Sequence, residues 1–351
     1  MTDLTRRKLM QCGPAAVAGA LAGARAALSQ TQRPSGAARS KRDLMLEVLN
    51  MEARPGYIPA GFFMHFGVKG DAAIKAHLDH FRGTGMDFVK IQFDEQTLAQ
   101  PPGNPIRTPQ DWNKFPIYAE KWWEPSLYLL RGLIREAKSE ALIIQTLFSP
   151  YQMAKQAVPS KTLIEHASQD PDAVGRGMEN ITLSLLHFAQ AAARAGADGF
   201  YMCTQGGETN RFAERALFAR AVKNYDMFLY KEAMQLTQCN IMHICDYDGP
   251  YNDFDARFQD YPGHLINIPL AAEGKPFSLR QAAELFQRPV MGGLNRQGVL
   301  VTGSPDEVRK ATVEALQDAP VNVVLGADCT VAKAPVENLR MAIRTAHEFR
   351  S

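Results

Sequence analysis

The sequence predicts an α/β protein folded as a closed (β/α)8 TIM barrel, and three observations support this. Eight short apolar segments recur along the chain, helical patterns separate most of them, and no G-x-G-x-x-G follows the first apolar segment, which disfavours an open dinucleotide-binding sheet. The predicted strands are residues 60–66, 86–93, 141–148, 197–204, 240–245, 264–269, 289–294 and 321–327. The predicted helices are residues 72–84, 126–139, 177–196, 208–238, 279–287 and 304–317.

The composition is that of a globular protein of enzyme size. The chain has 351 residues, 46% of them hydrophobic and 22% charged, which is enough for a well-developed core. The formal net charge is +2, and many basic residues fall within about the first forty positions, so the rest of the chain has no basic footprint for nucleic acid. No later stretch approaches the roughly 20 apolar residues of a membrane helix. We therefore expect neither nucleic-acid binding nor a membrane span.

The N-terminal segment has the pattern of an export signal. Arg6 and Arg7 precede a mildly apolar stretch of small residues, with an Ala-x-Ala spacing at Ala24 and Ala26 where cleavage can occur. This pattern is typical of a twin-arginine signal, which directs folded proteins across the bacterial inner membrane, and the alternative is a basic, disordered tail. We predict a periplasmic protein with a signal at residues 1–29, a linker at 30–42 and one barrel domain at 43–351.

Chemically versatile side chains gather where the predicted strands end. In a barrel, the carboxyl ends of the strands converge on one mouth. His243 and Cys245 are two positions apart in a strand and so point to the same face. With Cys329, 84 residues beyond Cys245, they form a candidate site of three ligands that suits zinc and leaves a fourth position open. The complete set of residues at strand ends is His65, Asp94, Ser149, Cys203, His243, Cys245, Asn267, Asn295 and Cys329.

Two other interpretations of the same residues stay open. In isolation, His243 and Cys245 also fit a buried strand, because free cysteine is among the most buried residue types. Cys245 and Cys329 could instead form a disulfide, because the predicted compartment is oxidising. The distances between the three side chains distinguish these interpretations.

Several segments resemble the uroporphyrinogen decarboxylase superfamily, in particular its zinc-dependent methyltransferase branch. The resemblance covers nearly the whole chain after the signal, and rests on HIC at a strand end, AGADGFYMCTQGG, VMGGLNRQGVLVTGSPDEVRKATVEAL, and GADCTV followed by APVENLRMAI. That branch includes methylcobamide:coenzyme M methyltransferases, and a similar H-x-C…C zinc pattern recurs in cobalamin-independent methionine synthase. The resemblance implies a (β/α)8 barrel, and it assigns the zinc-binding role to His243, Cys245 and Cys329.

The chain departs from the decarboxylases at its first predicted strand. Where those enzymes carry M-R-Q-A-G-R, whose arginines hold substrate carboxylates, this chain reads MHFGVK, which places His65 and Lys69 at those positions. Asp94 falls where the decarboxylases keep the aspartate that binds pyrrole N–H groups. The absence of both arginines, together with the predicted export, disfavours the haem-pathway decarboxylation itself.

The resemblance therefore implies an exported enzyme that transfers a methyl group to a small thiol substrate with the help of Zn²⁺. Methylated corrinoid or folate is the implied donor, and a corrinoid protein is a candidate partner. One alternative is a metal-independent decarboxylase of a porphyrinogen-like or aromatic acid, with Asp94, His65 and Lys69 as the residues that hold the substrate. The other is a non-catalytic periplasmic protein that uses the barrel mouth as a ligand cup.

Overall fold

The computed structural model describes residues 39–53, 56–92 and 105–350. The predicted signal, most of the predicted linker and Asp94 lie outside the described residues. Helix α2 (Lys41–Leu49) is capped by Ser40, whose side chain accepts a hydrogen bond from the backbone N–H of Asp43, while the Asp43 side chain accepts from the Ser40 backbone. The described fold thus begins with a well-capped helix close to residue 43, the predicted start of the barrel domain.

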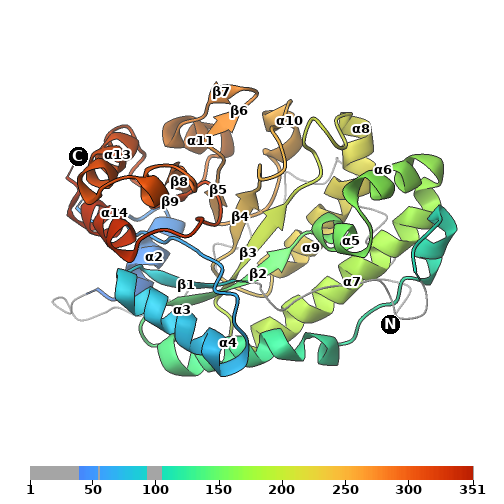
Figure 1. Cartoon of the computed structure of the whole chain (residues 1–351), viewed down its shortest axis with the longest axis horizontal. Coiled ribbons are helices and arrows are strands. Elements are labelled where there is room, and N and C mark those ends of the chain that lie inside the picture. Colours follow the sequence, from blue (N-terminus) through green and yellow to red (C-terminus); the bar gives the residue numbers. More distant parts are fainter. Residues whose placement is uncertain (1–38, 54–55, 93–104, 351) are drawn as a thin grey trace.

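A parallel sheet of seven strands forms the centre of the molecule, in the order β1-β2-β3-β4-β5-β8-β9 (Figure 1). Nearly all of its residues are buried, as expected for parallel strands that helices cover. These strands confirm seven of the eight predicted segments. They are β1 (Phe88–Ile91), β2 (Leu142–Phe148), β3 (Gly199–Thr204), β4 (Ile241–Ile244), β5 (Leu265–Asn267), β8 (Val290–Leu294) and β9 (Val323–Ala327).

The sheet curls like part of a TIM barrel, but its strand ladder is not the closed ring that the sequence predicts. The first predicted strand, residues 60–66, contributes a single parallel bridge from Ala60 to Leu325. Pro59 has no N–H to donate to a ladder, and the N–H of Ala60 binds the side chain of Asp87 at 2.8 Å instead of a strand carbonyl. The ladder is therefore interrupted between β9 and β1, and the prediction of a closed eight-stranded barrel was wrong on this point.

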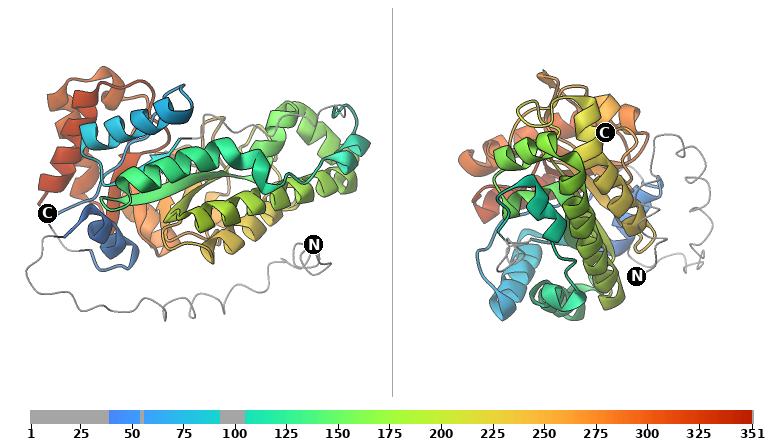
Figure 2. Two further views of the ribbon diagram at one scale, coloured as in Figure 1. Left: turned by 90° about the horizontal axis from the view of Figure 1, so that it is seen from below. Right: turned by 90° about the vertical axis from the view of Figure 1, so that its right-hand side faces the viewer.

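Helices cover the outer face of the sheet (Figures 1 and 2). Those that match predicted segments are α3 (Gly70–Thr84), α4 (Glu124–Ala137), α7 (Pro171–Ala195), α9 (Asn224–Met234), α11 (Leu279–Phe286) and α13 (Pro305–Gln317). The others are α5 (Pro150–Ala157), α6 (Ser160–Gln169), α8 (Arg215–Phe218), α10 (Phe254–Phe258), α12 (Val299–Thr302) and α14 (Val336–Glu348). Among the described residues, none of these helices combines the length and apolar character that crossing a membrane requires.

The predicted helix 208–238 is shorter and composite. It begins with α8, continues through the π-helical turn η4 (Ala219–Lys223), and ends with α9. The residues before α8 form a loop instead, in which the Gly206 N–H donates to Glu208 at 2.7 Å. This loop follows β3 and begins with Gln205 at the carboxyl ends of the strands.

The described part of the chain between β1 and α4 packs onto the fold through two tryptophans. It contains the 3-10 helices η2 (Pro109–Lys114) and η3 (Glu120–Trp123). Trp112 and Trp123 are fully buried, and the Trp112 indole N–H donates to His166 Nδ1 at 3.1 Å. Both side chains therefore serve packing.

A short hairpin follows β5 and was not predicted. Strands β6 (Ala271–Ala272) and β7 (Lys275–Pro276) pair antiparallel, and the two residues between them, Glu273 and Gly274, both have positive φ (54° and 73°). Positive φ at both central residues is what a type I′ hairpin turn requires. The Glu273 N–H donates to the carbonyl of Tyr251 at 3.2 Å, so the hairpin rests on the loop after β4.

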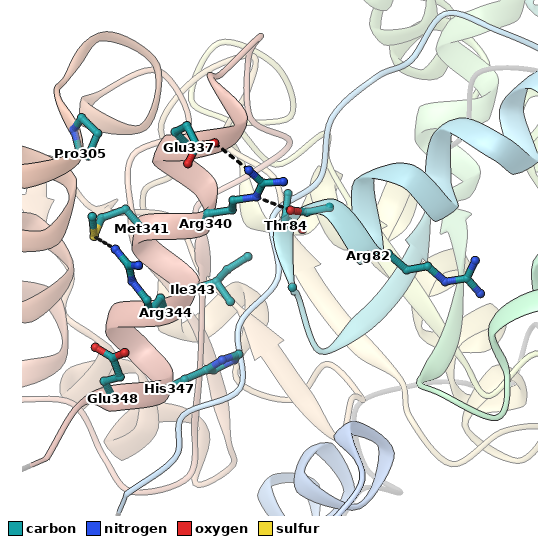
Figure 3. Close-up of a pocket in the computed structure, with 12 residues that line it drawn as sticks. Arg82, Thr84, Pro305, Glu337, Arg340, Met341, Ile343, Arg344, His347 and Glu348 are labelled. Atoms are coloured by element: carbon teal, nitrogen blue, oxygen red, sulfur yellow. Dashed lines mark hydrogen bonds and ion pairs between the residues drawn. The ribbon is translucent and has the colours of Figure 1, made fainter.

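A surface groove of about 640 Å³ runs along α14, between the end of α3 and the start of α13 (Figure 3). Arg340 crosses it, donating to the carboxylate of Glu337 at 2.7 Å and to the carbonyl of Gly83 at 2.5 Å. Arg82, at its edge, is paired with Glu140 at 2.5 Å. These contacts join the layer of helices, and the groove lies away from the strand ends that carry the candidate ligands.

Candidate metal centre

His243, Cys245 and Cys329 come together as the sequence predicts. Their ligand atoms all lie within 4.8 Å of one another, and the two sulfur atoms are 3.9 Å apart. Both cysteines are free thiols in the structure. Two sulfurs that bind one zinc ion tetrahedrally at about 2.3 Å would lie about 3.8 Å apart. The observed separation therefore fits shared ligation of one ion with almost no movement.

The strand register explains how the first two ligands are placed. Across the parallel ladder, His243 on β4 lies level with Cys203 on β3 and with Asn267 on β5. Cys245 follows the end of β4, and its N–H donates to the carbonyl of Thr204 at 3.2 Å, which continues the strand pairing by one residue. His243 and Cys245 therefore project from the same side of the sheet at the carboxyl end of β4.

The His243 side chain is held in place by its neighbours and has free coordination sites on its ring. Its ring stacks on Tyr201, with ring centroids 5.0 Å apart and an interplanar angle of 28°. Tyr201 is itself fixed, because its hydroxyl donates to Asn267 at 2.5 Å. Both ring nitrogens of His243 are buried, yet neither has a hydrogen-bond partner. A buried polar atom without a partner is costly, and coordination of a cation is one way to satisfy it. The residues present thus fit a metal ion.

The contact between the two sulfurs shifts the pKa of each thiol in opposite directions. The hydrogen bond from Cys245 lowers the pKa of Cys329, while the same hydrogen bond, together with burial, raises the pKa of Cys245. The Arg296 guanidinium further favours the Cys329 thiolate. Because thiolates are the forms that bind a metal, a bound cation would displace the proton that remains between them.

An arginine joins the two loops that carry the cysteines. Arg296, in the turn after β8, forms ion pairs with Asp246 at 2.9 Å and with Asp328. Asp246 directly follows Cys245 in the sequence, and Asp328 directly precedes Cys329. The three charged side chains are mostly shielded from solvent. One guanidinium therefore holds together the two segments whose sulfurs must meet.

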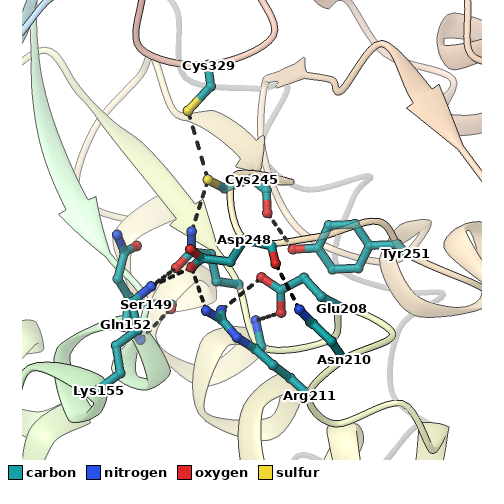
Figure 4. A network of polar contacts seen from close by, with 12 residues as sticks. Ser149, Gln152, Lys155, Glu208, Asn210, Arg211, Cys245, Asp248, Tyr251 and Cys329 are labelled. Carbon is teal, nitrogen blue, oxygen red and sulfur yellow. Dashed lines mark hydrogen bonds and ion pairs between the residues drawn. The ribbon is translucent and has the colours of Figure 1, made fainter. Parts of the chain in front are cut away.

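A second polar network reaches the Cys245 sulfur from the other side (Figure 4). The Gln205 side-chain amide donates to Cys245 Sγ at 3.1 Å, and Lys155 Nζ donates to Gln205 Oε1 at 2.6 Å. Lys155 also binds Asp248 at 2.8 Å, and Asp248 pairs with Arg211 at 2.6 Å. Gln205, Lys155 and Arg296 were not predicted from the sequence, although the position of Gln205 directly after a strand that ends at the mouth was a usable signal.

The three residues predicted to hold the substrate, as the candidate catalytic residues, have different positions. His65 is exposed, and Gln92 Nε2 lies 3.0 Å from its ring and 3.5 Å from the Thr330 hydroxyl, next to Cys329. His65 is thus linked through Gln92 to Thr330, the residue that follows Cys329. Lys69 is exposed as the N-cap residue of α3, where it makes no side-chain capping bond. Asp94 lies outside the described residues.

The other residues at strand ends serve the framework. Cys203 is buried, and burial raises the pKa of its thiol far above the usual range, so it remains protonated. The Asn267 amide donates to the carbonyls of Met291 and Ala327 at 3.1 Å each and thereby links β5, β8 and β9. Ser149 caps α5 by accepting from the N–H of Gln152. Asn295 accepts a hydrogen bond from the N–H of Gln297 at 2.8 Å.

Known structures with a similar fold include a methyltransferase and a methionine synthase. A methyltransferase from Methanosarcina mazei has a TM-score of 0.71 and 16% sequence identity, over 88% of this chain and 98% of that one. A B12-independent methionine synthase from a Shewanella species has a TM-score of 0.50 and 11% identity, over 84% of this chain and 93% of that one. At these identities, the likeness shows the fold alone. No match to this chain was found among curated protein sequences.

The sequence itself carries a family signal that spans most of the described structure. The family model for uroporphyrinogen decarboxylase (URO-D) matches residues 66–349. The matched segment begins six residues after the bridge at Ala60 and ends at Phe349, the C-cap residue of α14. It contains every strand of the central sheet and all three members of the cluster. The chain belongs to the uroporphyrinogen decarboxylase family.

Proposed function

We propose that this protein is a zinc-dependent enzyme that transfers a methyl group to a small thiol substrate, with His243, Cys245 and Cys329 as the zinc ligands. The observation that carries the proposal is the cluster itself. Two sulfurs 3.9 Å apart and a buried imidazole without a partner form a set of three ligands. Three protein ligands with a fourth position open is the pattern of catalytic zinc sites, whereas structural sites are closed by four.

Zinc, when bound, would hold the sulfur of the substrate as a thiolate near neutral pH. The chain supplies the geometry. Tyr201 and Asn267 orient the imidazole, and Arg296 joins the two loops that carry the cysteines. Burial of His243 and Cys245 excludes water from one side, so the partly exposed Cys329 marks the side from which substrate would approach. In the reaction, a sulfur–carbon bond forms as the bond between the methyl group and its donor breaks, and the thiol proton leaves to solvent.

The comparisons support methyl transfer at the level of the fold. The methyltransferase and the methionine synthase both resemble this chain over more than four-fifths of its length. We propose a methylated corrinoid or folate as the donor class, and a corrinoid protein as the partner if the donor is a corrinoid. For His65, which is linked through Gln92 to the segment that follows Cys329, we propose a role at the edge of the substrate site. Asp94 and Lys69 remain proposed substrate contacts.

We also propose that the protein works in the periplasm after twin-arginine export. The support is the Arg6–Arg7 pair ahead of a mildly apolar stretch of small residues. Because this route carries folded proteins, zinc would be bound before transport.

Elemental analysis of the purified protein tests the proposal. The wild type should contain or take up one zinc ion per chain, whereas Cys245→Ser and Cys329→Ser should lose most of it while remaining folded, since the cluster lies at strand ends and not in the core. Cys239→Ala is the matched control, because Cys239 is a buried cysteine outside the cluster. A wild type that binds no zinc, even after reduction and titration, would contradict the proposal.

A turnover assay then tests the reaction. The zinc-loaded wild type should methylate small alkanethiols with methylcobalamin or methyltetrahydrofolate as the probe donor, and both serine variants should be inactive. Zinc binding without alkylation of any thiol would retain the metal centre and refute methyl transfer. Release of carbon dioxide from an aromatic acid by the metal-free protein would favour the decarboxylase alternative.

A further inference from the structure

The Cys245 sulfur receives a hydrogen bond from a side chain that was not among the predicted ligands or substrate contacts. Gln205 Nε2 lies 3.1 Å from Cys245 Sγ, and both residues are buried. Gln205 is the first residue after β3, so it stands at the same edge of the sheet as the candidate ligands. An N–H donor directed at a sulfur favours the thiolate, which is the form that binds a metal.

Neighbouring residues fix the orientation of this amide. Lys155 Nζ lies 2.6 Å from Gln205 Oε1. A lysine ammonium group can only donate hydrogen bonds, so the oxygen of the amide must face Lys155 and its NH₂ group must face the sulfur. The reverse orientation would place a carbonyl oxygen against the sulfur and leave two donors facing each other. Lys155 thus determines that Gln205 donates to Cys245.

The network closes on the loop that carries the cysteine. Lys155 is held by Asp248 at 2.8 Å, and Asp248 lies three residues after Cys245. Asp248 is held in turn by Arg211 at 2.6 Å, on the loop that begins with Gln205. The contacts therefore form a cycle through α5, the loop after β3 and the loop after β4 (Figure 4). Such a cycle restricts both the donor and the sulfur.

We propose that Gln205 is a positioning residue of the metal centre, which donates an N–H···S hydrogen bond to the Cys245 thiolate and is held in that orientation by Lys155. The inference rests on the proposed zinc site. Partners of this kind, one contact beyond a metal ligand, orient the ligand and tune its basicity, and their loss typically lowers metal affinity about 10- to 100-fold. Gln205 does not itself bind the metal in this proposal.

The affinity for zinc and the absorption spectrum of bound cobalt test the role of Gln205, and neither measurement requires enzymatic turnover. Gln205→Glu keeps the shape of the side chain and an acceptor for Lys155, but it replaces the donor at the sulfur with a carboxylate oxygen. Gln205→Met keeps the length and removes both hydrogen bonds. In competition with a chromophoric chelator, both variants should bind zinc about 10- to 100-fold more weakly than the wild type, with one ion still bound at saturation. Gln259→Glu, which adds the same charge at an exposed site on the C-cap of α10, should match the wild type.

The absorption spectrum of the cobalt-substituted protein distinguishes the loss of one hydrogen bond from damage to the metal site. In both Gln205 variants, the ligand-field bands should keep their tetrahedral intensity, whereas the thiolate-to-cobalt charge-transfer band should move to lower energy, because the sulfur has lost a donor. Lys155→Met provides a second route if a Gln205 variant fails to fold, and it should give an intermediate loss of affinity because Gln205 remains but is no longer oriented.

The possible outcomes are distinct. Wild-type affinity and an unmoved charge-transfer band in the Gln205 variants would refute the role of Gln205 and leave the zinc site intact. A wild type that binds neither zinc nor cobalt would refute the zinc site, and this inference with it. Loss of the ligand-field bands in the variants would assign Gln205 to the maintenance of the site's fold and would also contradict the proposal.

Discussion

Asp226 provides a quantitative test of the packing beneath the candidate site. Its carboxyl group, on α9, is fully buried, and Oδ2 accepts hydrogen bonds from Thr204 at 2.6 Å and Tyr261 at 3.1 Å. Oδ1 is buried without a partner. Burial raises the pKa of Asp226 from 3.8 to about 8, an effect that the two hydrogen bonds only partly offset. We therefore expect Asp226 to be a neutral acid in the folded protein at neutral pH.

The expected dependence on pH follows from this difference in pKa. Between 3.8 and about 8, the folded chain holds a proton at Asp226 that the unfolded chain has released, so folding becomes less favourable as pH rises. The slope is about 1.4 kcal/mol per pH unit, or about 3 kcal/mol between pH 5 and pH 7. Above the folded-state pKa, the total loss of stability reaches its full value. About 6 kcal/mol is an upper limit for that loss, because the surrounding structure will relax around the charge.

Asp226→Asn should remove this contribution, because asparagine resembles the protonated acid in shape and is neutral at every pH. Urea unfolding, followed by circular dichroism from pH 5 to pH 8.5, should give similar free energies of unfolding for both proteins at pH 5. Above pH 5, the free energy of unfolding of the variant should exceed that of the wild type by an increasing amount. Asp255→Asn, at an exposed carboxylate on α10, is the matched control and should run parallel to the wild type. Parallel profiles for Asp226→Asn and the wild type would refute the reasoning.

Three further predictions concern the fold, the location and the site. Gly199→Ala should lower the free energy of unfolding in urea by about 3 kcal/mol or more, because its Cβ would lie 1.6 Å from the carbonyl oxygen of Cys239; normal stability would contradict this close approach. Replacing Arg6 and Arg7 together by lysine should leave unprocessed precursor inside the cell, and normal accumulation in the periplasm would rule out twin-arginine export. Lys69→Ala should keep the zinc content of the wild type, since Lys69 is outside the ligand cluster; a lower content by elemental analysis would contradict that placement.

Most of the sheet could be predicted from the sequence, because a strand buried on both faces leaves a largely apolar run such as residues 141–148. The exception is the first predicted strand. Residues 60–66 have the same apolar composition, yet they form only one bridge, since Pro59 cannot donate and Ala60 donates to Asp87. The carboxylate that takes the Ala60 N–H is 27 residues away in the sequence. Hydrophobic pattern predicts burial, but it does not predict where a backbone N–H finds its partner.

The candidate ligands were predictable for a different reason. His243 and Cys245 are a local pair, and the alternation of side chains along a strand places them on one face. Cys329 could be predicted as the third ligand only because strand ends are expected to meet at one edge and because the chain resembles a known family. Gln205 and Arg296 lie in segments that resemble the family and directly follow or closely follow strand ends, but glutamine and arginine are common in loops and no fixed spacing relates them to the cysteines. Their roles depend on which atoms of separate loops come into contact.

These contacts also explain how an open strand ladder can support a precise set of ligands. The two sulfurs come from the ends of β4 and β9, which are not neighbours in the sheet. Arg296 ties Asp246 to Asp328 across that distance, and Gln205 anchors the Cys245 sulfur to the loop after β3. The position of each cysteine is therefore set by side-chain contacts at the mouth, in addition to the backbone ladder below it. Because both ties are mostly shielded from solvent, they retain more of their electrostatic strength than surface ion pairs do.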